Sequence, residues 1–348
     1  MAKPLVISTN GLKTDFKECL SPRLLDILKK YYQGKVFIND KVSGALDLQI
    51  IEHVCCLDTK SQIKYNPSLP LVVHHTEGDP KYFQNIEEVE KHGVFLHSSY
   101  GLEKGKFFSY WQYDYLRAIE NLNIKVNRQN NLVPRFLCLN GRPDTHRYFV
   151  LQYLNDIGYI DNGLISFLNR YNQIENLIPY NNFKNLYEGS TDFIDELVKN
   201  KKVLELDITN NQLHKNDRSH NPAIYENTSI SLITETYADE RPGCFITEKS
   251  WKPIANMHFP IWIAQKGIVS AFRHMGYDVF DDLINHEYDT ISNYKERWKT
   301  AVNSMCAFLG EVEHMNFQTR QKLNNRLLNN QNRFFTKRIT QQEVETWL

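Results

Sequence analysis

The sequence predicts an α/β fold with two domains, each containing a mostly parallel sheet covered by helices. Short strand-like runs bounded by Gly, Pro or polar residues alternate with helical patterns, and this alternation restarts near residue 135. Such alternation is typical of parallel sheets because each crossover between parallel strands needs a long connection, usually a helix. A chain of 348 residues is long enough to build two cores of ordinary size.

The first domain is expected over residues 1–130. Its predicted strands are short and rich in β-branched or aromatic residues, and they lie at 5–8, 35–38, 71–75 and 94–97. Helical periodicity marks residues 23–30 and 113–122. Asn, Gln and Pro cluster at 127–134, which indicates a linker to the next domain.

The second domain is expected over residues 131–300 and has the character of a Rossmann-like βα domain. Its predicted strands lie at 135–140, 164–168, 203–208, 229–234 and 260–264. Its predicted helices lie at 144–157, 191–199 and 268–275, and a further one begins at Thr247.

A helical C-terminal segment is expected over residues 301–348, packing back on the first domain. Leu323, Leu327 and Phe334 fall on one face of it, which favours an amphipathic helix with a solvated basic side. The second interpretation is a surface that faces a phosphate backbone. Residues 314–342 contain no acid, and their basic residues are Arg320, Lys322, Arg326, Arg333, Lys337 and Arg338.

Bulk composition is that of a globular protein, which we expect to lie in the cytoplasm. The formal net charge is zero and the pI is about 7.2, which gives no general argument for binding a polyanion. The six cysteines form no C-x-x-C pair, which favours a reducing compartment. No signal peptide and no apolar run of about 20 residues is apparent, so we expect no membrane span.

The first candidate site lies where the strand at 135–140 meets its helix. Asn140 ends the strand, and Gly141 permits close approach of a ligand to the backbone. Arg142 and Arg147 could bind one diphosphate, since planar guanidinium groups pair with phosphate through two parallel hydrogen bonds. The alternative is a surface ion pair between Asp144 and Arg147, three residues apart.

The second candidate site is the helix that begins after Thr247. A helix N-terminus carries unpaired N–H groups and a partial positive charge, which Thr247 can cap and Lys249 can strengthen as an anion site. Glu248 can accept hydrogen bonds from hydroxyl groups. Glu235, at the end of the strand at 229–234, adds a second carboxylate at the same sheet edge. The alternative is an ion pair between Glu248 and Lys252 with no ligand.

In chain order, these two sites resemble the donor half of inverting GT-B glycosyltransferases, particularly the fucosyltransferase-like and exostosin-like groups. The segment at 246–254 resembles a branch of such proteins in bacteriophages and other viruses. The resemblance covers residues 135–300, including 272–277 and 280–282, and it implies a GT-B-like arrangement of two Rossmann-type domains facing a cleft.

The resemblance also implies roles for the donor-binding residues. Glu248 would hold the ribose hydroxyls and Glu235 would contact the donor sugar or the nucleotide. Lys249, Arg142 and Arg147 would neutralise the diphosphate. Gly141 and Asp144 stand where the resemblance implies more basic character, so the division of roles between the two arginines stays open.

The chemistry of sugar transfer then suggests where the remaining groups lie. The sequence contains no D-x-D triplet, so we expect no metal and no cofactor, and the cations stabilise the leaving diphosphate. A general base should come from the first domain, after the strand at 71–75. Candidates for it are Glu77 and Asp79, then His74 or His75, with His97 and Asp40 as further strand-end positions.

The sequence is compatible with two classes of acceptor. The hydroxymethyl group of a modified pyrimidine in double-stranded phage DNA is one interpretation, with the basic C-terminal segment contacting phosphate. A glycan or a lipid-linked acceptor is the other. A non-catalytic module that binds nucleotide sugars is a hypothesis from a different class. A Rossmann oxidoreductase is disfavoured, because no G-x-G-x-x-G follows a predicted strand.

Overall fold

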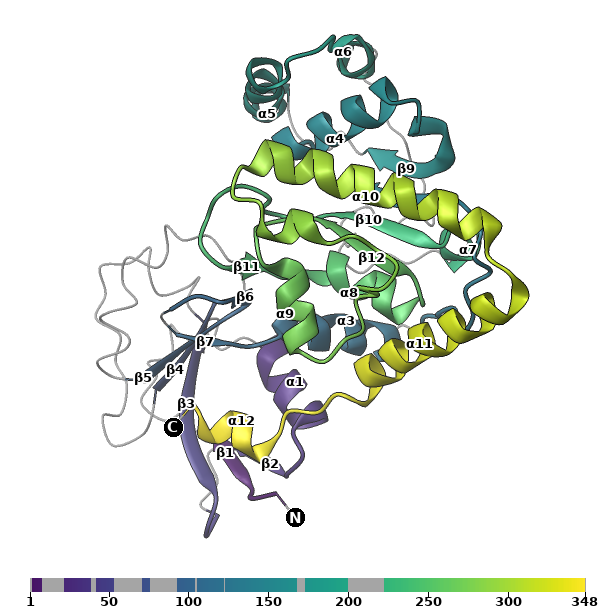
Figure 1. Ribbon diagram of the computed structural model, residues 1–348. Coiled ribbons are helices and arrows are strands. Elements are labelled where there is room, and N and C mark those ends of the chain that lie inside the picture. The colour runs from purple at the N-terminus through teal and green to yellow at the C-terminus, as the bar shows by residue number, and fades with distance from the viewer. Residues whose placement is uncertain are drawn as a thin grey trace. The chain divides into compact units, whose positions relative to one another are not determined.

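The protein is a mixed α/β structure with parallel sheets, which confirms the α/β part of the predicted fold class (Figure 1). The computed structural model describes residues 2–7, 22–38, 42–52, 71–75, 93–103, 105–121, 123–167, 173–199 and 222–347. The chain divides into two compact units. The first comprises Met1–Arg117 with Thr336–Leu348, and the second comprises Ala118–Phe335.

The first unit is built on a six-stranded parallel sheet of order β2-β1-β3-β4-β5-β7. Helix α1 covers Pro22–Tyr31, and α3, over Tyr110–Asn121, begins in this unit. The strands are β1 Leu5–Ile7, β2 Val36–Ile38, β3 Leu46–Glu52, β4 Leu71–His75, β5 Gly93–His97, β6 Ser99–Tyr100 and β7 Lys106–Phe107.

Four of these strands, β1, β2, β4 and β5, confirm sequence predictions, whereas β3 was not predicted. Its sequence places Asp47 between Leu46 and Leu48, and Asp is depleted in strands. In the structure β3 pairs with β1 on one side and β4 on the other. Pairing on both sides therefore overrides the weak local preference.

The end of the chain belongs to the first unit. Ile339 forms a parallel bridge with Tyr32, and the Lys3 backbone N–H donates to the Gln341 side chain at 2.8 Å. Helix α12 covers Gln341–Glu345, and the ring of Trp347 contacts that of Phe108 edge-on at 5.4 Å. These contacts attach residues 336–347 to the N-terminal strands and to α1.

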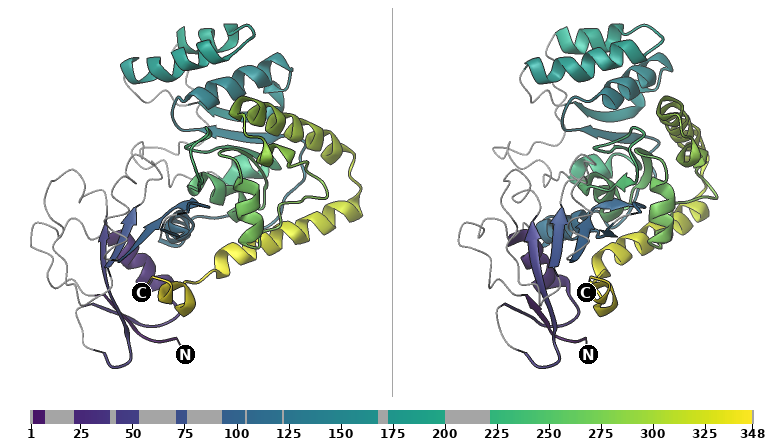
Figure 2. Two further views of the ribbon diagram at one scale, coloured as in Figure 1. Left: turned by 60° about the vertical axis from the view of Figure 1, so that its left-hand side comes forward. Right: turned by 90° about the vertical axis from the view of Figure 1, so that its left-hand side faces the viewer.

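The second unit contains a four-stranded parallel sheet of order β12-β10-β8-β9. Helix α4 lies between this sheet and the pair α5 and α6, while α8 and α10 pack against β10 and β12 (Figure 2). The strands are β8 Phe136–Asn140, β9 Gly163–Phe167, β10 Ile230–Thr234, β11 Cys244–Phe245 and β12 Phe259–Ile263. The helices are α4 Thr145–Asp156, α5 Gln173–Leu186, α6 Asp192–Lys199, α7 Pro222–Glu226, α8 Glu248–Ala255, α9 Ile268–His274, α10 Tyr294–His314 and α11 Phe317–Thr336, with short 3₁₀ turns η4 Ile160–Asn162 and η5 Glu287–Thr290.

Strand order in this sheet creates a switch point between β8 and β10. The chain leaves β8 toward β9 on one side, and it later returns to place β10 on the other side of β8. In open α/β sheets, ligands bind outside the carboxyl ends of the strands where the order reverses. A ligand site is therefore expected at the residues that follow Asn140 and Thr234.

Most elements predicted for residues 131–300 are confirmed, including β8, β9, β10, β12, α4, α6, α8 and α9. The predicted strand at 203–208 lies outside the described residues. Helix α5 was not predicted because Pro179 stands inside it and its sequence shows little amphipathic periodicity.

Helix α11 confirms the amphipathic interpretation of the C-terminal segment, since Leu323, Leu327 and Phe334 are buried. The arginines of α11 donate hydrogen bonds to groups within the second unit. Arg326 pairs with both Asp278 and Asp282. Arg320 donates to main-chain carbonyls that include Leu132, at 3.0 Å, and Arg333 donates to that of Met275.

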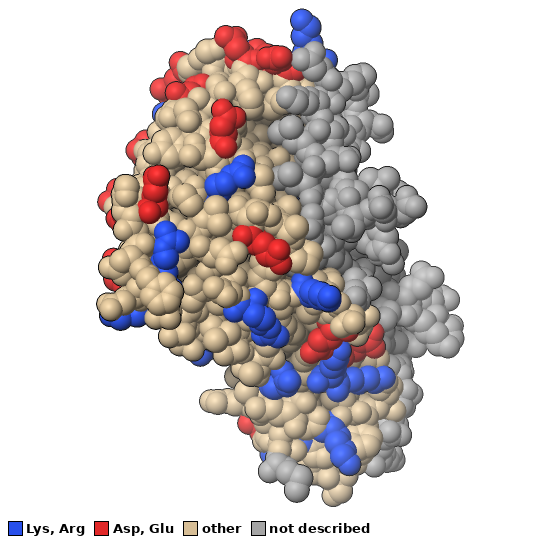
Figure 3. All heavy atoms as spheres, turned by 90° about the vertical axis from the view of Figure 1, so that its right-hand side faces the viewer, with Lys and Arg blue, Asp and Glu red and all other residues tan. Residues whose placement is uncertain are grey.

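The face shown in Figure 3 carries Lys and Arg side chains that are interspersed with acidic and uncharged residues. Lys322 is exposed on α11, whereas Arg320 and Arg326 are partly covered. The free positive charge of α11 is therefore smaller than its sequence alone suggests. Within the described part of the chain, no helix is both long and apolar enough to cross a membrane.

Candidate functional site

A cavity of about 600 Å³ opens in the second unit beside the carboxyl ends of β8 and β10. Helix α4, the loop after β10 and the start of α10 contribute to its wall. Its polar lining includes Arg142, Asp144, His146, Thr236, Asp239 and Arg241, and its aromatic lining comprises Tyr237, Tyr294 and Trp298. Its position is the one that the switch point in the sheet predicts.

Arg142 lines this cavity with a partly exposed guanidinium group. Its side chain is 41% exposed, and Nε lies 3.8 Å from Oδ2 of Asp144, which is too far for a hydrogen bond. No described residue accepts a hydrogen bond from its guanidinium group. None of the five donors of Arg142 is therefore occupied by a described residue, and all five can bind an anionic ligand as far as the described chain is concerned.

Asp144 sits at the N-cap of α4. Its Oδ1 accepts a hydrogen bond from the Thr145 N–H at 3.1 Å. Burial raises the pKa of Asp144, but the charge that His146 carries once it is protonated, the charges of Arg147 and Arg142 and the N–H of Thr145 outweigh it, so the pKa falls below its ordinary value. Asp144 is thus a carboxylate at neutral pH.

His146 is buried in the wall of the cavity and is neutral near pH 7. Its Nε2 lies 2.9 Å from the main-chain oxygen of Glu235. Burial lowers the pKa of the imidazole to about 4, against the attraction of Asp144. A carbonyl oxygen carries no proton, so the hydrogen bond requires the proton to be on Nε2 and leaves Nδ1 as an acceptor.

Arg147 lies beneath the cavity with 1% of its surface exposed. Its guanidinium group donates to the main-chain oxygens of Arg142 at 2.9 Å, Thr234 at 3.3 Å and Glu235 at 3.4 Å. Its Nε is buried without a hydrogen-bond partner among the described residues. The side chain ties the ends of β8 and β10 together and leaves its positive charge behind the cavity wall.

Asn140 also connects the carboxyl ends of β8 and β10, from a buried position. It is fully buried, and its amide donates to the Ser166 carbonyl at 3.1 Å while its Oδ1 accepts from Thr234 Oγ1 at 2.7 Å. These bonds join the carboxyl ends of β8, β9 and β10. Asn140 therefore positions the loops that form the cavity and does not line it.

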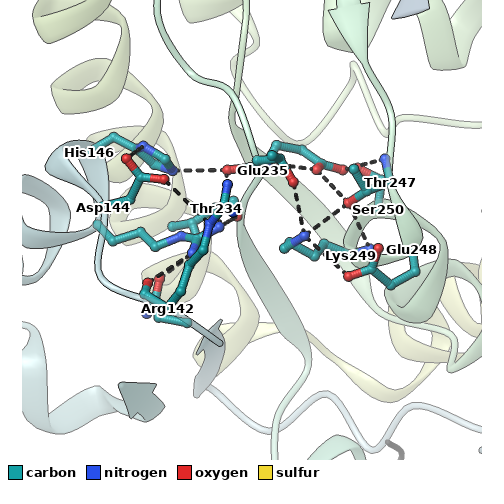
Figure 4. A network of polar contacts seen from close by, with 12 residues as sticks. Arg142, Asp144, His146, Thr234, Glu235, Thr247, Glu248, Lys249 and Ser250 are labelled. Carbon is teal, nitrogen blue, oxygen red and sulfur yellow. Dashed lines mark hydrogen bonds and ion pairs between the residues drawn. The ribbon is translucent and has the colours of Figure 1, made fainter. Parts of the chain in front are cut away.

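Glu235 is a buried carboxylate that holds the start of α8 (Figure 4). Oε1 accepts from the Thr247 N–H at 3.0 Å and from Ser250 Oγ at 2.6 Å. Oε2 accepts from Thr247 Oγ1 at 2.6 Å and from the Thr236 N–H at 3.0 Å. With four protein donors and no exposed surface, this carboxylate acts on a ligand only through the elements that it positions.

Helix α8 begins as the sequence predicts, with Thr247 as its N-cap. Lys249 Nζ donates to Thr236 Oγ1 at 3.2 Å, to Thr247 Oγ1 at 3.2 Å and to Glu248 Oε1 at 3.1 Å. Lys249 and Glu248 therefore form an ion pair between neighbouring residues. Thr236 lines the cavity, so the charge of Lys249 lies one hydroxyl group away from it.

Arg297 and Trp298 of α10 fix the opposite wall of the cavity. The buried guanidinium group of Arg297 donates to the main-chain oxygens of Ala238 at 3.1 Å and Asp239 at 2.9 Å, and its other donors reach three further carbonyls. Trp298 Nε1 donates to the same Ala238 oxygen at 2.8 Å. The loop after β10 is thus held from both ends, by Arg147 and by Arg297.

The aromatic residues in the cavity lining are held by two separate sets of contacts. The guanidinium carbon of Arg241 lies 4.1 Å from the centre of the Tyr237 ring, close enough for a cation–π contact. Arg241 Nε also pairs with Asp239 Oδ2 at 3.0 Å. Tyr294 and Trp298 contact each other at 4.9 Å between ring centres.

The predicted donor-binding residues therefore fall into three positions within one polar network (Figure 4). Arg142 lines the cavity, Asn140, Arg147 and Glu235 lie beneath it, and Thr247, Glu248 and Lys249 lie beyond Thr236. Among the predicted catalytic residues, His74 and His75 end β4, but their side chains are outside the described residues. Glu77, Asp79 and Asp40 also lie outside them. His97 ends β5 and is buried.

Seven further residues of the site were not predicted from the sequence, namely His146, Tyr237, Asp239, Arg241, Tyr294, Arg297 and Trp298. His146 lies within the first predicted motif and Arg241 lies shortly before the second. Their closeness to these motifs could have marked both as candidate site residues. Tyr294 and Trp298 belong to α10, about 60 residues after the loop that they contact. Periodicity alone assigns such residues to a helix and not to a site.

Buried neutral histidines predict a loss of stability in mild acid. Burial lowers the pKa of both His146 and His258 to about 4, below about 6.5 in the unfolded chain. The unfolded state thus binds more protons between pH 6.5 and 4, so stability present above pH 6.5 is lost as the pH falls through this window. We expect the free energy of unfolding to fall by about 2 kcal/mol per histidine from pH 7 to pH 5.

Urea denaturation at pH 7 and pH 5 measures this loss. His258→Gln removes one titrating group, so the variant should lose less stability between the two pH values than the wild-type protein. His314→Gln, at an exposed position, is the matched control and should lose as much as wild type. Equal losses in all three proteins would contradict the prediction.

Comparisons of the chain with protein-family models, with curated proteins and with solved structures find no match. Within the described residues, no group of three or more His, Cys, Asp or Glu side chains is arranged to hold a metal ion.

Proposed function

We propose that the protein is an inverting glycosyltransferase that moves a sugar from a nucleoside-diphosphate sugar to an acceptor hydroxyl without a bound metal. The open guanidinium group of Arg142, in a cavity at the β8/β10 switch point, supports this proposal most directly. The cavity volume of about 600 Å³ falls in the range of pockets that enclose small ligands.

The chemistry of the cavity wall suits the parts of such a donor. The half-buried ring of Tyr294, which packs against the buried ring of Trp298, offers apolar surface for a base. Arg142 offers bidentate hydrogen bonds to a phosphate, and Asp144 offers an acceptor for a hydroxyl group.

Charge around the cavity favours an anionic ligand. Four guanidinium groups surround it, from Arg142 and Arg241 in its lining and from Arg147 and Arg297 behind it. The last two are held by carbonyl oxygens and leave their charge uncompensated by a bonded carboxylate. Carboxylates also lie nearby, among them those of Asp144, Asp239 and Glu235, and those of Asp289 and Glu240, which act on Arg297. As the bond to the sugar breaks, the leaving diphosphate gains negative charge, which these fixed cations stabilise.

The acceptor side of the proposal rests on the sequence. We propose a GT-B arrangement in which the first unit supplies the general base from the segment after β4, with Glu77 or Asp79 as first candidates and His74 or His75 next. Three arginines of α11 make internal contacts, so DNA contact through this helix has fewer cations available. A modified pyrimidine in DNA and a glycan or lipid-linked hydroxyl are therefore both to be assayed as acceptors.

A thermal-shift panel of nucleoside diphosphates and their sugar conjugates tests the donor site. Ligand at 100 times its dissociation constant should stabilise the fold by about 2.7 kcal/mol and raise the melting temperature visibly. If no nucleotide shifts the melting temperature, the donor site proposed here is wrong.

Transfer assays separate an enzyme from a binding module. Glu77→Ala or Asp79→Ala should keep the thermal shift but lose sugar transfer, since a general base contributes about 10²- to 10⁴-fold to rate. A wild-type protein that binds nucleotide sugars but neither transfers nor hydrolyses them would instead be a binding module.

A further inference from the structure

We infer that Asp144 and His146 form an acceptor pair that binds a vicinal diol next to the phosphate of the ligand, either in the ribose or in the transferred sugar. This inference rests on the proposed function and identifies residues that would determine specificity in the same cavity. The two side chains project from the start of α4 into the cavity wall (Figure 4).

Two hydrogen-bond acceptors, Oδ1 of Asp144 and Nδ1 of His146, lie side by side, and neither carries a proton. His146 donates from Nε2 to the Glu235 carbonyl, so its neutral ring presents a lone pair on Nδ1. This Nδ1 lies 3.8 Å from Oδ1 of Asp144, which is beyond hydrogen-bond distance. Carboxylate and imidazole lone pairs at this separation repel each other unless a donor group lies between them.

A vicinal diol satisfies both atoms at once. It supplies two O–H donors from neighbouring carbons, one for the carboxylate and one for the imidazole nitrogen. A carbonyl or phosphate oxygen supplies none, and it would add a third acceptor. The pair therefore selects a hydroxyl-bearing part of the ligand.

The neighbouring arginine indicates which hydroxyl groups are in reach. Arg142 Nε lies 3.8 Å from Oδ2 of the same Asp144 carboxylate. A phosphate bound to Arg142 would thus lie beside the group bound at Oδ1. In a nucleoside-diphosphate sugar the sugars flanking the diphosphate carry hydroxyls there, namely the ribose on one side and the transferred sugar on the other.

Both acceptors are held in place before a ligand arrives. Asp144 is fixed by its bond to the Thr145 N–H, and His146 is fixed by the Glu235 carbonyl and by the ring of Trp298 at 5.9 Å. Little side-chain entropy is then lost on binding, which makes such a pair effective in discrimination.

Matched ligands test the inference by calorimetry. One arm compares a nucleoside diphosphate with its 2′-deoxy analogue, and the other compares a nucleoside-diphosphate sugar with the analogue that lacks the sugar hydroxyl nearest the anomeric carbon. The wild-type protein should bind the complete ligand about 10-fold more tightly in the arm that contains the bound diol. The arm that responds identifies the sugar.

Asp144→Asn then assigns the effect to this pair. Asn caps helices as well as Asp does, so α4 should keep its start, while one charged acceptor is lost. The variant should reduce the 10-fold preference to about twofold or less. Asp192→Asn, in the exposed first turn of α6, is the matched control and should keep the full preference.

The outcomes separate this inference from the proposed function. If nucleotides bind but the wild-type protein shows no preference in either arm, or if Asp144→Asn keeps the preference, the acceptor pair is wrong and the donor site stands. If no nucleotide or nucleotide sugar binds at all, the proposed function itself fails.

Discussion

Replacing Glu235 by Ala should lower the free energy of unfolding of the second unit by about 3–5 kcal/mol. The substitution removes the acceptor of four hydrogen bonds, from two main-chain N–H groups and two hydroxyl groups. Three of these donors are buried and the Thr236 N–H is partly buried, and each loses the hydration of its polar group when it is left without a partner. The removed side chain also leaves a cavity between β10 and α8.

Urea denaturation followed by tryptophan fluorescence measures this loss. Three of the five tryptophans, Trp251, Trp262 and Trp298, are buried in the second unit and report on its unfolding. Glu240→Ala, an exposed acid in the same loop, is the matched control and should change stability by less than about 0.5 kcal/mol. A Glu235→Ala variant as stable as the control would show that the network is not what holds α8.

Glu235 also illustrates what the sequence could not reveal about the site. Its position at the end of β10 was predictable from the apolar run before it, and so was the start of α8 at Thr247. The direction of its carboxylate was not predictable. That direction depends on Thr247 and Ser250, which return to the end of β10 only after the intervening loop has folded.

The two arginines of the first motif make the same point. Arg142 and Arg147 were interchangeable in the sequence, yet one is 41% exposed in side chain and the other is almost completely buried. The difference arises because α4 begins between them, at Thr145, and Arg147 is carried under the ends of β8 and β10. Helix boundaries decide exposure here, and boundaries are the least predictable part of an element.

The fold was more predictable than the site because its signals are local. Strand-like runs and the Thr247 cap are properties of a few neighbouring residues. The cavity instead depends on contacts between α4, the loop after β10 and α10, and the bond from Trp298 to Ala238 spans 60 residues. Two buried arginines, Arg147 and Arg297, give this loop its shape and also place positive charge behind it.

Replacing Arg142 by Ala should weaken nucleotide-diphosphate binding about 10- to 100-fold, because hydrogen bonds to a charged group contribute about 1.5–3 kcal/mol. The fold should be unaffected, since no described residue accepts a hydrogen bond from this guanidinium group. Calorimetry with the nucleotide that gives the largest thermal shift measures the affinity, and the melting temperature without ligand measures the fold.

Arg135→Ala provides the matched control for this experiment. Arg135 immediately precedes β8, at the end of the strand opposite Arg142, and it is not part of the cavity lining. Its removal changes the net charge of the unit by the same amount, so it should lower the affinity only through long-range electrostatics, by about twofold or less in 0.15 M salt. If both variants bind as tightly as the wild-type protein, the ligand does not contact Arg142. A phosphate bound at the β8/β10 switch point lies near Arg142 and far from Arg135, so it must distinguish the two ends of β8. If both variants weaken binding equally, the effect is therefore one of overall charge.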